Sequence, residues 1–136
     1  MQFVSIRLIT ADVPALVAFY ERVSSVEAQW GNEVFAELRC GSATLAVAGT
    51  QTVGLFGPGA AEPAANRSVI IEFLVDDVDG RYAELAGAIG EVGGEFVNEP
   101  TTMPWGNRSL LLRDPDGNLV NLFTPVTAAA REKFGR

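Results

Sequence analysis

The chain has 136 residues, of which 48% are hydrophobic and 20% are charged, and its formal net charge is −7. This length suits one domain or two small repeated units that share a core, and the composition is typical of a globular protein. Arginine and lysine never cluster, and no apolar run approaches the roughly 20 residues that cross a bilayer. We therefore expect no nucleic acid and no membrane among its partners.

Histidine is absent from the chain, and Cys40 is the single cysteine. Without histidine, Ser–His and Cys–His nucleophilic pairs and imidazole-based metal sites are excluded. A lone cysteine excludes an internal disulfide, and we interpret Cys40 as a small core residue at a strand end. The N-terminal residues MQFVSIRLI lack the pattern of a signal peptide, which favours a cytoplasmic protein.

The first half of the chain predicts one helix among several strands. An alternating strand pattern leads to Asp12, the expected N-cap of an amphipathic helix. The apolar face of that helix comprises Leu16, Val17, Phe19, Tyr20 and Val23. Strand patterns follow over residues 33–40 and 43–49, and residues 50–66, rich in Gly, Pro and Ala from 52 onward, predict a linker.

The second half repeats the first at a constant offset of 65 residues, so that Asp77 matches Asp12. Its helix is expected to stop at Gly90, and strands are expected over residues 94–100, 107–114 and 118–123. We therefore predict an α+β fold of two βαβββ modules, with module one at residues 1–49, module two at 67–124 and a helical tail at 125–136.

Three segments resemble the vicinal oxygen chelate superfamily, which includes glyoxalase I, bleomycin-resistance and fosfomycin-resistance proteins, and extradiol dioxygenases. They are FYERV (19–23), FLVDDVDGRYAEL (73–85) and MPWGNRSLLLRDPDGNLVNLF (103–123). The resemblance extends from about Phe3 to Phe123. It implies two modules whose strands form a cup-shaped mixed sheet with helices outside, a site inside the cup, and a homodimer.

In the metal-using members of that superfamily, each module supplies one ligand from its first strand and one from its last, usually His and Glu. The resemblance places these ligands at Ser5, Ile70, Asn121 and a residue within 44–46. Neutral and apolar side chains are weak ligands or none. We therefore expect no metal and no other cofactor, and Asn121 stands out as an amide in an otherwise apolar strand.

Strand parity predicts which side chains line the cup. With Trp30 and Trp105 as candidate aromatic walls, the proposed ligand-binding set is Ser5, Arg7, Phe35, Glu37, Arg39, Ile70, Glu72, Trp105 and Asn121. Arg7 and Glu72 are equivalent under the 65-residue offset, and we expect them to lie close together. They form either an internal salt bridge or a contact with ligand.

Three functions are compared for this chain. The first is metal-independent binding of a small organic molecule, as in the bleomycin-resistance branch, and an acidic chain with a partly aromatic cup suits a cationic or planar ligand. The second is a metal-free isomerase, epimerase or lyase with Glu72, or else Glu37, as general base, because a partly desolvated carboxylate can abstract a proton next to a carbonyl. The third, a metal-dependent glyoxalase or dioxygenase, conflicts with the missing ligands.

Overall fold

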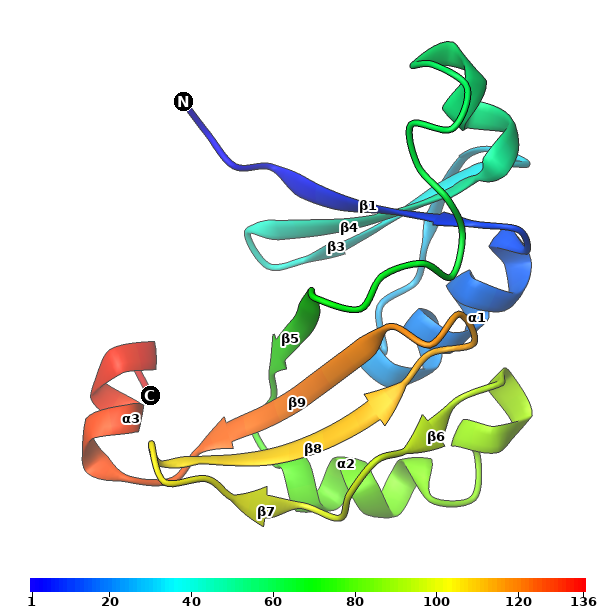
Figure 1. Cartoon of the computed structure of the whole chain (residues 1–136). Coiled ribbons are helices and arrows are strands. Elements are labelled where there is room, and N and C mark those ends of the chain that lie inside the picture. Colours follow the sequence, from blue (N-terminus) through cyan, green and yellow to red (C-terminus); the bar gives the residue numbers. More distant parts are fainter. The chain divides into compact units, whose positions relative to one another are not determined.

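The computed structural model describes residues 1–136 and contains two compact units, each built from one sheet with helices (Figure 1). The first unit comprises residues 1–66 and 115–117, and the second comprises residues 67–114 and 118–136. Both sheets are mixed, so the predicted α+β class with two related modules is confirmed. None of the helices is long and apolar enough to cross a bilayer.

The first unit has strand order β1-β4-β3-β2, in which β1 runs parallel to β4 and the other pairs are antiparallel. Its elements are β1 (Ser5–Thr10), α1 (Val13–Ser24), β2 (Gln29–Asn32), β3 (Phe35–Cys40), β4 (Ala43–Gly49) and a 3₁₀ helix (Thr50–Leu55). The linker expected after β4 thus begins with a helical turn.

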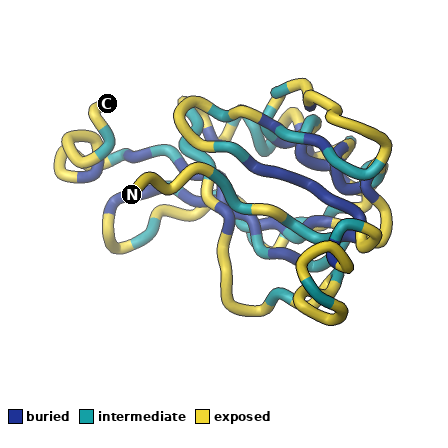
Figure 2. The backbone as a smooth tube through the Cα atoms, turned by 90° about the horizontal axis from the view of Figure 1, so that it is seen from above, coloured by how far each residue is buried: buried dark blue, intermediate teal, exposed yellow.

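The core of the first unit lies between α1 and one face of its sheet. Asp12 caps α1 by accepting a hydrogen bond from the backbone N of Ala15 at 3.1 Å. All five residues of the predicted apolar face are buried, and so are Leu38 and Val47 of the sheet. Figure 2 shows how buried and exposed residues are distributed along the backbone. Val4 precedes β1 and is 61% exposed.

Strand β2 was not predicted. Its sequence, QWGN, is exposed throughout and has no apolar alternation, because the strand pairs only with β3 at the edge of the sheet. The ladder is irregular between Trp30 and Asn32. An edge strand of this kind leaves little signal in the sequence.

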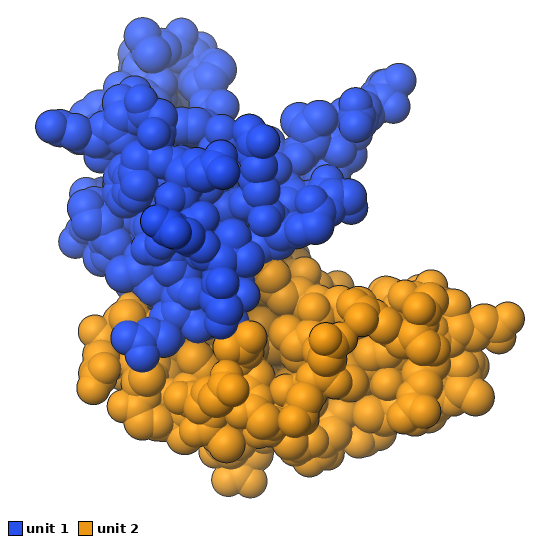
Figure 3. Space-filling model, turned by 180° about the vertical axis from the view of Figure 1, so that it is seen from behind, with its two compact units in different colours: residues 1–66, 115–117 blue, residues 67–114, 118–136 orange.

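The second unit, orange in Figure 3, has strand order β5-β9-β8-β6, with β7 also paired to β8. Its elements are β5 (Ile70–Leu74), α2 (Val78–Leu85), a 3₁₀ helix (Ile89–Val92), β6 (Glu95–Phe96), β7 (Thr101–Thr102), β8 (Asn107–Arg113), β9 (Leu119–Pro125) and α3 (Ala128–Phe134). The first strand is again parallel to the last, β5 to β9.

Two boundaries in the second unit differ from expectation. Helix α2 ends at Leu85, and Gly90 lies inside the following 3₁₀ helix. The strand expected over 94–100 is split into β6 and β7, because Asn98 intervenes and its side-chain oxygen accepts a hydrogen bond from the backbone N of Leu111 at 2.8 Å. A side chain therefore replaces one rung of the backbone ladder.

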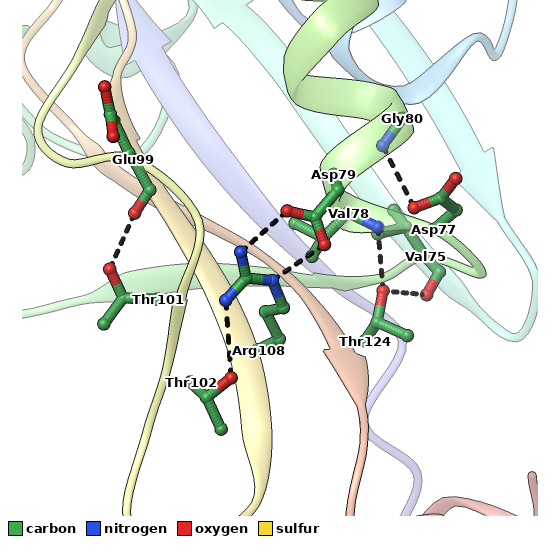
Figure 4. A network of polar contacts seen from close by, with 10 residues as sticks. All are labelled: Val75, Asp77, Val78, Asp79, Gly80, Glu99, Thr101, Thr102, Arg108 and Thr124. Carbon is green, nitrogen blue, oxygen red and sulfur yellow. Dashed lines mark hydrogen bonds and ion pairs between the residues drawn. The ribbon is translucent and has the colours of Figure 1, made fainter.

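Helix α2 is fixed to its sheet through its N-terminus (Figure 4). The Asp77 carboxylate accepts a hydrogen bond from the backbone N of Gly80 at 3.0 Å, which confirms the predicted cap. The Thr124 hydroxyl of β9 accepts a bond from the backbone N of Val78 and donates one to the carbonyl of Val75, both at 2.9 Å. One hydroxyl thus satisfies groups at the start of the helix and the end of β5.

A second connection to α2 is the ion pair between Arg108 of β8 and Asp79 (Figure 4). Arg108 donates from Nε and Nη2 to the two carboxylate oxygens at 2.7 and 2.8 Å. The hydrogen bond from Arg108 lowers the pKa of Asp79, although desolvation opposes the shift, and Coulombic attraction to Arg108 adds to it. The pair joins helix and sheet on the face that α2 covers.

Helix α3 lies on the opposite face of this sheet from α2. The ring of Phe134 contacts that of Phe123 on β9, with centroids 5.0 Å apart. Gly106, with φ of +93°, lets the chain pass close to Thr127, the N-cap of α3, where any β-carbon would collide with the threonine side chain. The predicted helical tail is therefore present, and it covers part of a face that the strand pattern had assigned to the site.

Candidate functional site

The side of each sheet that faces away from α1 or α2 is here called its site face. In the first unit, the ladder places Arg7 of β1 and Glu37 of β3 on either side of Ala46 on β4. Ser5 and Arg39 likewise flank Thr44. Because paired residues point to the same side of a sheet, these four predicted side chains share one face.

Arg7 is held by aromatic contacts. Its guanidinium carbon lies 5.2 Å from the ring centroid of Phe35 and 5.6 Å from that of Phe56. Such distances are those of cation–π interactions. Phe35 was a predicted site residue, whereas Phe56 was missed because it lies in the 50–66 segment, whose sequence has no strand or helix period to place it.

The two tryptophans do not behave alike. Trp30 pairs with Ala36, which faces α1, so the expectation that Trp30 forms a wall of the site is wrong. Its position follows from the added strand β2, which the sequence did not reveal. Trp105 lies in the turn before β8 and is 68% exposed, and its role as a wall stays a prediction.

In the second unit, Glu72 and Asn121 pair directly across β5 and β9. Asn121 donates a hydrogen bond from Nδ2 to Glu72 Oε2 at 2.7 Å. An ionised carboxylate only accepts, so the amide must turn its NH₂ group toward Glu72 and its carbonyl oxygen away. That oxygen is buried and has no hydrogen-bond partner, whereas Glu72 is an exposed residue.

Two further buried polar atoms lie on the same site face. Ser109 pairs with Phe123, and Asn107 pairs with Pro125, so both point to the side of β8 and β9 that carries Asn121. The hydroxyl oxygen of Ser109 and the side-chain oxygen of Asn107 are also buried without partners. These polar atoms were not predicted from the sequence, because a strand sequence does not show whether its Ser and Asn side chains form hydrogen bonds.

Ile70, the remaining predicted site residue, lies on the edge strand of the second sheet. Ile70, at the start of β5, is 49% exposed. Arg7 and Glu72 lie in different units, so their direct pairing stays a prediction. Cys40 is half-buried at the end of β3, and burial raises the pKa of its thiol.

The positions where the resemblance places metal ligands do not fit a divalent cation. Ser5 offers a neutral hydroxyl, Ile70 offers nothing, and Asn121 offers one neutral amide oxygen. The ladder makes Ala46 the counterpart of Asn121 in the first unit, so the fourth position is also without a ligand. Within neither unit do three or more cysteine or carboxylate side chains gather as a metal site requires.

The sequence matches the family model of the Glyoxalase/Bleomycin resistance protein/Dioxygenase superfamily over residues 2–122. A glyoxalase/bleomycin resistance protein/dioxygenase family enzyme from Burkholderia phytofirmans PsJN is 18% identical, with a TM-score of 0.77 over 90% of this chain and 97% of that one. A glyoxalase-related enzyme from Fulvimarina pelagi is 21% identical, with a TM-score of 0.75 over 93% of each chain. A virulence protein from Salmonella typhimurium is 23% identical, with a TM-score of 0.70 over 93% of this chain and 98% of that one. These structures show a shared fold, and comparison with curated proteins gave no match.

Proposed function

Because the chain belongs to the Glyoxalase/Bleomycin resistance protein/Dioxygenase superfamily, as its sequence had indicated, we propose that it binds a small organic molecule at its site faces without a metal ion. The observation that carries this proposal is the buried, unpartnered side-chain oxygen of Asn121 beside the Glu72 carboxylate. Leaving such an acceptor unpaired costs about 1–3 kcal/mol. An N–H or O–H donor of a ligand would remove that cost.

The charge around this oxygen favours a cationic donor. Glu72 is the residue next to Asn121 on the site face, and the whole chain carries a net charge of −7. Beside Asn121, a cation gains from both charges, whereas an anion is repelled at this position. Small primary amines and amidines are therefore the ligand classes to test at this position.

A thermal-shift screen of small amines and amidines, run on the wild type and on Asn121→Leu, tests the proposal. Leucine keeps the side-chain volume and removes the acceptor. We expect compounds that raise the wild-type Tm to leave the Tm of the variant unchanged. Equal shifts in both proteins, or no shift with any compound, would contradict the proposal.

Metal independence is tested by elemental analysis of protein purified without chelators. The donor set described above leads us to expect no stoichiometric zinc, nickel, manganese or iron. Turnover of the methylglyoxal–glutathione adduct should also be undetectable, with or without added metal. Stoichiometric metal that survives gel filtration would contradict this part of the proposal.

A metal-free isomerase, epimerase or lyase is the second candidate, and the orientation of Glu72 favours it. Its Oε2 is held by Asn121, while the residue stays exposed and could reach a substrate proton. Incubation in D₂O of any ligand found in the screen separates the two candidates. Deuterium uptake that disappears in Glu72→Gln would indicate catalysis, and binding without uptake would indicate a binding protein.

We further propose a cytoplasmic homodimer. Both sheets have free edges, and large apolar side chains are exposed near β5 and β8, among them Val69, Ile70 and Trp105. Exposed strand edges and apolar residues are commonly covered by pairing of subunits. Light scattering at micromolar concentration should give twice the chain mass, and a monomer mass would contradict the proposal.

A further inference from the structure

Arg7 carries an unused set of hydrogen-bond donors. Its guanidinium contacts the rings of Phe35 and Phe56, but within the first unit it forms no hydrogen bond and no ion pair. A guanidinium has five N–H donors, and ring contacts occupy none of them. The side chain is thus oriented, charged and free to bind.

Small residues of the central strand and two further charged side chains share the site face with Arg7. The residues of the central strand on this face are small, namely Thr44, Ala46 and Ala48. Glu37 lies across Ala46 and makes no ion pair with Arg7, and Arg39 is on the same face. Two arginines and one glutamate make this face positive in a chain that is negative as a whole.

We propose that Arg7 binds an oxyanion group of the ligand, either a carboxylate or a phosphate. The planar guanidinium matches both groups by two parallel N–H···O bonds, and charge-assisted bonds of this kind are stronger than neutral ones. The contacts with Phe35 and Phe56 restrict the side chain beforehand, which reduces the conformational entropy lost on binding. This inference rests on the proposed function for the presence of a ligand, but it uses only residues of the first unit.

Benzoate and benzamide form a matched pair of probes, since they share shape and differ in charge, and phenylphosphonate represents the phosphate class. Titrations followed by the Nε–Hε resonance of Arg7 report on the side chain itself. We expect benzoate or phenylphosphonate to shift this resonance and benzamide to leave it unchanged. Whichever anion binds more tightly identifies the preferred oxyanion.

Three variants complete the test. Arg7→Gln should weaken benzoate binding by roughly ten-fold or more, because a charge-assisted pair is lost. Arg22→Gln removes the same charge from an exposed position on α1 and should have no effect. Phe56→Ala removes a ring that is 73% exposed, so the fold should persist while benzoate binding weakens a few-fold.

Equal binding of benzoate and benzamide, or unchanged benzoate binding in Arg7→Gln, would overturn the inference. No binding of either anion would overturn it as well. If amines still stabilise the protein through Asn121 in that case, the inference fails alone and the proposed function stands. If neither class of compound binds, both fail.

Discussion

Arg7 and Glu72 occupy equivalent positions in the two units, yet their charges are held in different ways. Glu72 faces Asn121 across the ladder and accepts its hydrogen bond, whereas Arg7 faces Ala46, which offers none. Arg7 instead rests against two aromatic rings. The difference follows from the residue on the last strand. Asn121 can form a hydrogen bond to the charged side chain opposite it, and Ala46 cannot.

The two site faces are also covered by different segments. In the first unit, Phe56 reaches the face from the segment after β4 and is largely exposed. In the second unit, helix α3 packs against Phe123 beside the buried Ser109. The two site faces therefore differ because the segments that cover them, the one after β4 and helix α3, lie outside the repeat.

The largest expected difference between the units concerns the residues that flank the turn before the last strand of each sheet. In the second unit, buried Asp114 accepts hydrogen bonds from the backbone N and the side-chain Nδ2 of Asn118 at 2.9 and 2.7 Å. Asp114→Ala should lower the free energy of unfolding by about 3 kcal/mol, because both buried donors lose their acceptor. Urea denaturation measures the change.

The matched control for this turn is Ser42→Ala, in the exposed turn between β3 and β4 of the first unit. We expect a change within about 0.5 kcal/mol, as is usual for surface positions. Equal changes in the free energy of unfolding for the two substitutions would show that the buried Asp114–Asn118 hydrogen bonds do not stabilise the fold.

Gly106→Ala should weaken the covering of the second site face. The substitution forces an unfavourable φ and a collision with Thr127, at a cost of about 2 kcal/mol. The loss should be concentrated in α3, so hydrogen exchange there should accelerate more than in β8 and β9. Exposed Gly54→Ala, which meets no neighbouring atom, is the control in the first unit. Uniform acceleration across the second unit would contradict this local role.

Asn121→Leu should raise stability while it abolishes binding. The substitution removes a buried, unpartnered oxygen and leaves Glu72 in contact with solvent, so we expect a gain of about 1 kcal/mol in the free energy of unfolding. Thermal and urea denaturation measure it. A clear loss of stability would indicate that the Asn121–Glu72 bond serves the fold more than a ligand.

The smallest expected effect is a pH dependence confined to the second unit. The pKa of Asp79 is lowered by Arg108, so the pair stabilises the fold above the usual carboxyl pKa of 3.8, and this contribution is lost as the pH falls through the lowered value. In Asp79→Asn, the stability of α2 should no longer fall as the pH decreases through this range. Hydrogen exchange of α2 amides across this range is the measurement, and α1, which has no acidic residue in its first turn, provides the comparison.

The repeat and strand parity were sufficient to predict the framework of both site faces. Alternation placed Arg7 with Phe35 and Glu37, and the Asp12 and Asp77 caps located both helices. What could not be predicted depends on contacts between segments without a period of their own. The approach of Phe56 to Arg7 and the docking of α3 are of this kind.

Cys40 offers a chemical reporter that distinguishes the two units. It is the only thiol in the chain and lies in the first unit, where burial raises its pKa and slows its reaction. The rate at which a thiol reagent labels Cys40 in increasing urea therefore follows the opening of the first unit alone. Labelling that precedes the loss of the far-ultraviolet circular dichroism signal would mean that the two halves unfold as separate cooperative blocks, and coincident curves would mean one.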